Sequence, residues 1–178
     1  MKNSFSKNIL EKAYEYIKSN KKAVMTTVVE TWGSSPQPIG SKMLVNDDGD
    51  FFGSVSGGCV ETFIIKESLE IIKKDKSFKI KKFKVSNKNA WDVGLSCGGE
   101  IIVYLEQIDK INGFIKEIIQ KKKGKLEFAS LTNLTTGNKE IFKKGKTLNK
   151  DFKKFTNKIN LFLKSKNNGT IKNSNIFV

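Results

Sequence analysis

The chain has 178 residues, of which 38% are hydrophobic and 29% charged, so it is long enough for one globular domain with a substantial core. All 33 basic residues are lysine, the net charge is +15 and there is no histidine, which excludes a Ser-His-Asp triad, a Cys-His pair and a histidine metal site. No apolar run reaches the roughly 18–20 residues that span a bilayer, and the N-terminal residues lack the apolar core of a signal peptide. Two cysteines are too few for a disulfide framework. We therefore expect a cytoplasmic protein with free thiols and no membrane association.

The first half of the chain predicts two helices separated by strands. Apolar residues recur at helical spacing in residues 8–19, and the β-branched sequence at 23–31 predicts a buried strand. Short strands at 41–45 and 51–56 flank the turn sequence NDDGD, which indicates a hairpin. Residues 60–75 return to helical spacing.

The second half mixes strands and helices in the same way. Residues 77–85 alternate with one slip, which predicts a strand with a β-bulge, and a loop at 87–99 leads into a strand at 100–107. Residues 110–123 follow the pattern of an amphipathic helix. Strands at 125–133 and 139–144 flank the turn TTGN. A last helix at 152–162 and a terminal strand at 173–178 complete the chain. The sum is an α/β fold, with α+β as the alternative, in a single domain over residues 1–178 with a mixed β-sheet and flanking helices.

The positive charge is concentrated in the C-terminal part of the chain. Residues 109–178 hold 17 lysines against 5 acidic residues, a net of +12, whereas residues 1–108 hold 16 against 13, a net of +3. Such a surface can serve an anionic ligand, an acidic partner or nucleic acid, so a basic partner-binding module is one alternative function. Base-specific contacts rely on bidentate arginine, which this chain lacks. We therefore favour a compositional bias toward lysine and asparagine and do not expect nucleic acid as a partner.

The segment GSVSGGCVETF, residues 53–63, combines a strand end, a Ser-Gly-Gly step and a helix start. Backbone N–H groups and the helix dipole at such a place favour anions, and glycines let a ligand approach the backbone. The segment matches neither a Walker loop nor the G-x-G-x-x-G dinucleotide motif. Cys59 lies at the helix start, where the dipole favours the thiolate, which can bind a soft metal or attack an electrophile.

The second cysteine, Cys97, also lies beside two glycines, in GLSCGGEI. If the two segments meet in space, both thiols face one cleft, but each cysteine can equally be a small packed core residue. A thiol-based redox protein that uses Cys59 and Cys97 is a second alternative function. The absence of a C-x-x-C motif and of histidine argues against it, and two cysteines are too few ligands for structural zinc.

Four further residues carry weaker signals. Lys42 follows the proline-containing loop and can meet a phosphate or a carboxylate, although a surface lysine is the commoner case. Glu61 lies in the first turn of the predicted helix, where a carboxylate interacts favourably with the dipole. Trp32 and Trp91 lie near the glycine-rich segments and can stack on a flat heterocycle, although tryptophan more often covers a core.

These segments, in this order, resemble the XdhC/CoxI family. The resemblance covers roughly residues 22–107 and is carried by VVETWGSSPQPIGSKMLV, DGDFFGSVSGGCVE and GLSCGGEIIVYLE, with a weaker similarity that continues to the C-terminal NIFV. Members of the family are accessory proteins for molybdenum hydroxylases such as xanthine dehydrogenase and carbon monoxide dehydrogenase. The resemblance implies a protein that binds the molybdenum cofactor as cargo, protects it during sulfuration by a cysteine desulfurase, and delivers it to the large subunit of the apo-enzyme. It thus implies a maturation factor rather than a catalyst.

Carried onto this sequence, the resemblance implies that the thiols of Cys59 and Cys97 contact the cofactor and its molybdenum. Sulfur ligands suit the soft environment of a molybdenum-dithiolene centre. The other implied cofactor-binding residues are glycines that let the backbone close on the pterin or its phosphate, and polar side chains that can donate hydrogen bonds: Gly57, Gly58, Gly98, Gly99, Ser34, Ser54, Ser56 and Lys42. The resemblance also allows a homodimer, which the pattern of elements neither requires nor excludes.

The sequence departs from the family pattern in two respects. Many members have arginine after the first proline of the SSP loop, where this chain has Gln37, so a fixed positive charge for anion recognition is missing. Many members also continue into a Rossmann-type domain, whereas this chain reaches Val178 without a G-x-G-x-x-G motif. The resemblance is therefore to the N-terminal domain only, and we expect neither NAD nor FAD. A short family member, and a separate protein that supplies the second domain, both stay open.

Overall fold

The structure, a computed structural model, describes residues 4–33, 37–84, 99–143 and 148–178. Its internal contacts divide the chain into two compact units, Met1–Asn112 and Gly113–Val178. That a single domain extends over residues 1–178 stays a prediction. Among the described residues, no helix combines the length and the hydrophobicity of a membrane-crossing segment.

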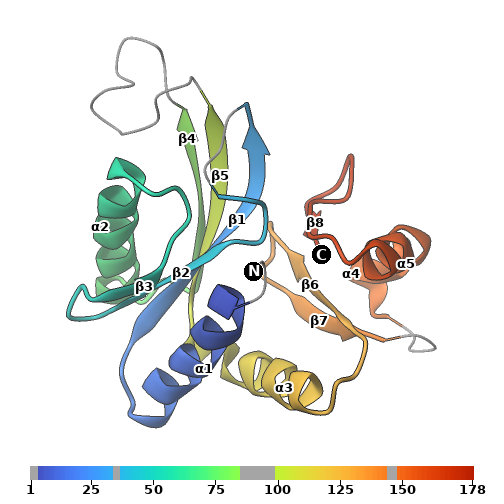
Figure 1. The fold of residues 1–178 in the computed structure, drawn as a ribbon, viewed down its shortest axis with the longest axis horizontal. Helices are drawn as coiled ribbons and strands as arrows, with labels where there is room; N and C mark the ends of the chain where they lie inside the picture. Colours follow the sequence, from blue (N-terminus) through green and yellow to red (C-terminus); the bar gives the residue numbers. More distant parts are fainter. Residues whose placement is uncertain (1–3, 34–36, 85–98, 144–147) are drawn as a thin grey trace. The chain divides into compact units, whose positions relative to one another are not determined.

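The first unit contains a five-stranded sheet with the strand order β3-β2-β1-β5-β4 (Figure 1). Its strands are β1 (Ala23–Trp32), β2 (Lys42–Asn46), β3 (Phe51–Gly53), β4 (Phe78–Lys84) and β5 (Glu100–Gln107). The long strand β1 lies in the middle and pairs with β2 on one side and with β5 on the other, antiparallel in both cases. Because β1 and β5 are far apart in the sequence, this central pairing joins the two ends of the unit.

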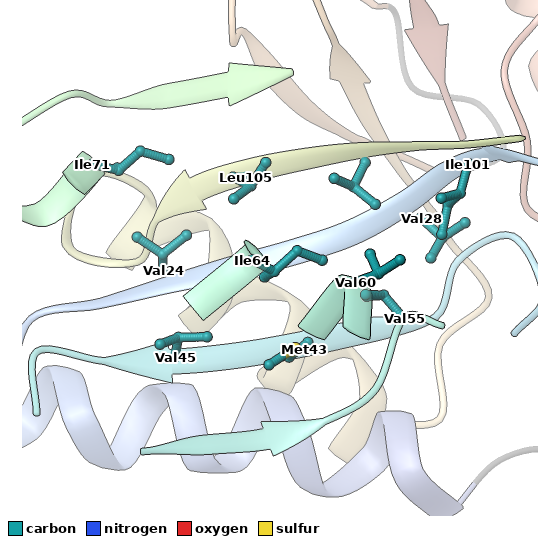
Figure 2. Packing of buried hydrophobic residues seen from close by; sticks show 11 residues of the cluster. Val24, Val28, Met43, Val45, Val55, Val60, Ile64, Ile71, Ile101 and Leu105 are labelled. Carbon is teal, nitrogen blue, oxygen red and sulfur yellow. The ribbon is translucent and has the colours of Figure 1, made fainter. Parts of the chain in front are cut away.

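Two helices, α1 (Ser4–Lys18) and α2 (Cys59–Lys73), pack against this sheet. Helix α1 contacts β1, β2 and β3, whereas α2 lies across β1, β2, β4 and β5. The face of α2 that meets the sheet carries Val60, Ile64 and Ile71, and every second residue of the strands points toward it. Figure 2 shows this core, whose buried members are Val24, Val28, Met43, Val45, Val55, Val60, Ile64, Ile71, Ile101, Val103 and Leu105.

The second unit combines a three-stranded antiparallel sheet, in the order β7-β6-β8, with helices. A short 3-10 helix, η1 (Asp109–Ile111), precedes it. Its elements are α3 (Asn112–Lys123), β6 (Ala129–Asn133), β7 (Lys139–Phe142), α4 (Lys150–Lys153), α5 (Thr156–Ser165) and β8 (Ile176–Phe177). Its own core centres on Leu131, Phe152 and Ile159, which are fully buried.

The predicted fold class is confirmed, because helices and strands are mixed along the chain. The prediction of one mixed sheet is wrong. Every strand pair among the described residues is antiparallel, and the strands form two sheets. The physical reason is that α2 joins the two edge strands β3 and β4, so it does not connect adjacent strands in the parallel direction.

The predicted β-bulge in the strand after α2 is also wrong. Strand β4 pairs with β5 in an unbroken register. The slip in its alternation arises because Phe83 packs against the core under α2, while Phe78 and Ile80 lie on the other face of the sheet. The irregularity in this sheet occurs instead in β1, where the register with β5 shifts between Val28 and Glu30.

A close backbone approach at the end of β3 predicts an asymmetric response to two glycine substitutions. Gly53 has φ +87°, and a Cβ atom there would lie 2.4 Å from the carbonyl oxygen of Lys42. Gly49 has φ +86° but open space around its Cβ position. We expect Gly49→Ala to lower the free energy of unfolding by about 1–2 kcal/mol, through backbone strain alone, and Gly53→Ala to cost about 1–3 kcal/mol more, because of the collision. Urea unfolding measures both, and an equal loss in the two variants would contradict the close approach.

Candidate functional site

The carboxylate of Glu61 holds the loop that joins β3 to α2. Four hydrogen bonds reach its Oε1 atom and one reaches Oε2. The donors are Ser54 Oγ (2.8 Å) and the backbone N–H groups of Val55 (3.3 Å), Ser56 (2.9 Å), Gly57 (2.6 Å) and, to Oε2, Gly58 (2.8 Å). Successive backbone N–H groups that converge in this way form a concavity for an anion. In this protein, a carboxylate of the same chain lies in it.

The local sequence explains this arrangement. Gly58 is the N-cap residue of α2 and Glu61 is its third helical residue, the position from which a glutamate side chain reaches back to the N-cap N–H group. Gly57 has φ +90°, a left-handed conformation that glycine adopts without strain. Ser56 is buried, whereas Gly57 and Gly58 are exposed. The loop is therefore anchored from beneath and presents glycine backbone to solvent.

The hydrogen bonds keep Glu61 ionised. Burial raises the pKa of this carboxyl group, but the hydrogen bonds from Gly57, Gly58 and the two serines of the loop favour the charged form and outweigh burial. The net result is a pKa below the usual value for glutamate. A negative charge is thus present at the positive end of the α2 dipole.

Cys59 is the first residue of α2 and lies in a row of positions that runs above β4. The row continues one turn further with Phe63, whose ring centroid lies 6.4 Å from that of Phe83, and two turns further with Glu67. Glu67 forms ion pairs with Lys79 (2.5 Å) and Lys81 (2.8 Å) of β4. Since α2 and β4 run in opposite directions, position 59 lies toward the C-terminal end of β4 (Figure 1).

The described ends of both glycine-cysteine segments lie at the same end of the sheet. Gly58 ends the first segment before α2, and Gly99, which is buried, leads into β5. Figure 2 shows Val60 and Val55 packed near Ile101 in the shared core. The backbone on either side of the two segments is thus joined by one hydrophobic cluster.

Apart from Lys42, the sequence-predicted site residues fall into three groups. Ser54, Ser56, Gly57 and Gly58 share one loop and donate hydrogen bonds to the same carboxylate. Gly99 directly precedes β5. Cys97, Gly98 and Ser34 lie outside the described residues. The backbone of Cys59 is described, but its thiol is not.

Two other candidates lie on the face of the sheet opposite α2. Lys42 precedes Met43, which faces α2, so its side chain lies on the other face, where Nζ donates a hydrogen bond to Thr27 Oγ1 (2.7 Å). Trp32 ends β1 opposite Glu100 and is 72% exposed. The structure therefore does not bring the Lys42 side chain to the loop before α2, and Trp32 is not the core cover that is usual for tryptophan.

Reasoning from the sequence missed two features of this end of α2. Glu61 was expected to interact with the helix dipole, but it organises the whole loop. A glutamate three residues after the Gly-Gly step is the capping signal that would have indicated this. Phe63 shares the helical spacing of Val60, Ile64 and Ile71, yet it is 46% exposed. No sequence signal distinguishes it from Val60 and Ile64, since all three lie close together on one side of the helix.

The described residues do not form a metal cage at this end of the sheet. Among them, no group of three His, Cys, Asp or Glu residues could hold a metal ion. At this end of the sheet, the backbone of Gly57 and Gly58 is exposed and α2 starts with a cysteine. The ionised carboxylate of Glu61 lies among the N–H groups of the loop before α2.

Comparisons with known proteins match the same part of the chain. Residues 16–83 match the model of the XdhC and CoxI family. The molybdenum cofactor insertion chaperone PaoD of Escherichia coli (strain K12) is 37% identical over 103 residues, which are 57% of this chain and 31% of PaoD. The protein YqeB of the same strain is 32% identical over 98 residues, 55% of this chain and 18% of YqeB. The predicted resemblance is thus confirmed.

A solved structure supports the fold alone. The crystal structure of a xanthine dehydrogenase from Bacillus halodurans aligns with a TM-score of 0.65 and 21% identity, covering 83% of this chain and 47% of that one. The chain therefore spans about half the length of this structure, and about a third or less of the two curated relatives.

The role of Glu61 predicts a pH-dependent loss of stability in Glu61→Gln. The glutamine nitrogen would place a donor against an N–H group, so we expect a loss of about 1–3 kcal/mol at pH 7. Because folding lowers the pKa of Glu61, its contribution is present above the unfolded-state pKa of about 4.3 and is lost as the pH falls through the lower folded-state value. The difference between wild type and Glu61→Gln, measured by urea unfolding, should shrink over that range.

A matched control is Glu15→Gln. Glu15 lies on α1, is exposed and pairs with Lys12 at 3.1 Å. We expect Glu15→Gln to change the free energy of unfolding of the protein by about 0.5 kcal/mol or less. A similar loss in both variants, or a loss in Glu61→Gln that does not depend on pH, would count against the role assigned to Glu61.

Proposed function

We propose that this chain, an XdhC and CoxI family protein over residues 16–83, is an accessory protein that binds the molybdenum cofactor as cargo and delivers it to a molybdoenzyme. The apo-enzyme large subunit served would be of the xanthine dehydrogenase or carbon monoxide dehydrogenase type. The name of PaoD, a molybdenum cofactor insertion chaperone, supports an accessory role of this kind. The chain would act in maturation rather than as a catalyst.

The observation that carries the proposal is the ordered loop before α2. Five hydrogen bonds to Glu61 hold it in one conformation, with Cys59 as the first helical residue and Gly57 and Gly58 exposed beside it. A loop that is ordered before the ligand arrives loses less conformational entropy on binding. A thiolate at this place would be a soft ligand for a molybdenum-dithiolene centre.

The second thiol would come from the segment before β5. Cys97, with Gly98 and Gly99, precedes a strand that starts at the same end of the sheet as the loop before α2. We propose that both thiols contact the same cargo. Because the Glu61 carboxylate already accepts the hydrogen bonds of four successive N–H groups, the cargo phosphate would have to be held elsewhere.

The proposal includes two protein partners. A cysteine desulfurase would sulfurate the cargo while it is held, and the apo-enzyme would then receive it. Neither step requires NAD or FAD from this chain. A role as a basic partner-binding module would not involve the ordered loop before α2, so we rank that role second.

The thiols predict a loss of cofactor binding in Cys59→Ser and in Cys97→Ser. The cofactor would be released from a donor molybdoenzyme under anaerobic conditions, and bound molybdenum would be measured after equilibrium dialysis. We expect each substitution to weaken binding by about tenfold or more, the equivalent of about 1.4 kcal/mol. Thermal unfolding should be close to that of the wild type.

A matched control is Thr156→Ser, because Thr156 is the first residue of α5 and its hydroxyl bonds to the Lys153 carbonyl at 2.6 Å, a contact that serine can keep. This control should bind as the wild type does. Unchanged retention in both cysteine variants would overturn the proposed function, and rapid reversible oxidation of the two thiols without cofactor binding would favour the redox alternative.

A further inference from the structure

Phe63 is an exposed aromatic residue on the helix that starts with Cys59. Its ring is 46% exposed, although Val60 and Ile64 beside it on α2 are buried. The ring packs on one side against Phe83 of β4, with the planes tilted by 47°. Single exposed hydrophobic residues are common on protein surfaces, and what distinguishes Phe63 is its place one helical turn from Cys59.

The position of Phe63 relates it to the loop before α2. Positions 59 and 63 are one turn apart on the same face of α2, about 6 Å along the helix axis. The Glu67 ion pairs with Lys79 and Lys81 fix the next turn of this row above β4. A ligand that touches residue 59 can therefore extend along the helix onto the Phe63 ring.

The other strongly exposed aromatic residues of the first unit lie elsewhere. Trp32, 72% exposed, belongs to the opposite face of the sheet. Phe51, 56% exposed, pairs with Val45 near the end of the sheet where β1 begins, whereas Phe83 lies near the end where β1 finishes. Among the described residues, Phe63 is thus the exposed aromatic side chain at the Cys59 end of the α2 face.

Resting on the proposed function, we propose that Phe63, supported by Phe83, is the surface on which the planar heterocycle of the cargo stacks. The conjugated pyrimidine ring of a pterin presents a flat π-face, and a phenylalanine ring stacks on such a face without the need for a particular hydrogen-bond pattern. This contact does not compete with Glu61 for the N–H groups of the loop. Phe63 would then determine specificity for a ring, while Cys59 determines specificity for the metal centre.

The test compares Phe63→Leu, Phe63→Tyr and the control Phe51→Leu in the full chain. Anaerobic equilibrium dialysis measures the affinity for the whole cofactor, and fluorescence anisotropy measures the affinity for 6-carboxypterin, which contains no metal. We expect Phe63→Leu to weaken cofactor binding by about fivefold or more, as the loss of one stacking contact does. Phe63→Tyr and Phe51→Leu should bind as the wild type does, and thermal unfolding identifies any variant that fails to fold.

Cys59→Ser separates this inference from the proposed function. It should leave 6-carboxypterin binding unchanged and weaken only the whole cofactor, whereas Phe63→Leu should weaken both. If the whole cofactor binds in a Cys59-dependent way and Phe63→Leu has no effect on it, the stacking inference is overturned and the proposed function stands. If the wild type binds no cofactor, the proposed function fails and the inference fails with it.

Discussion

The Glu61 carboxylate accepts hydrogen bonds from five groups of the loop before α2, and the shape of that loop depends on them. Without this acceptor, four successive N–H groups would face one another with no anion between them. With it, the chain turns from β3 into α2 and places Cys59 at the first helical position. The proposed site therefore depends on a charge that belongs to the protein itself. The same charge makes this concavity a poor place for a phosphate.

The hydrophobic core beneath α2 fixes the position of the loop before α2 relative to the sheet. Val60 and Ile64 pack against strands on both sides of β1, and the Glu67 ion pairs hold the next turn of the helix against β4. Because β5 pairs along the whole length of β4, the start of β5 is fixed relative to α2 as well. The sheet thus relates two glycine-cysteine segments that are well separated in the sequence.

Most individual elements could be predicted from the sequence, because they depend on local patterns. The spacing of Val60, Ile64 and Ile71 indicated α2, and the turn sequence NDDGD indicated the β2–β3 hairpin. Strand direction and sheet number could not be predicted in this way, since they depend on which distant strands pair. The β-bulge was predicted in β4 but occurs in β1 for a related reason. A break in the alternation of apolar and polar residues does not show which face of the sheet each side chain occupies.

For the candidate site, the sequence by itself determined the chemistry on offer: two thiols beside glycine pairs, no histidine and no arginine. It also determined the resemblance to a family, because that lies in the order and identity of residues. Only the tertiary structure decided that Glu61 lies among the N–H groups of its own loop, that the Lys42 side chain lies on the other face of the sheet, and that Phe63 is exposed while its helical neighbours are buried. The physical reason is that hydrogen bonding and burial depend on which atoms meet after the chain has folded, and residues close in the sequence can meet quite different surroundings.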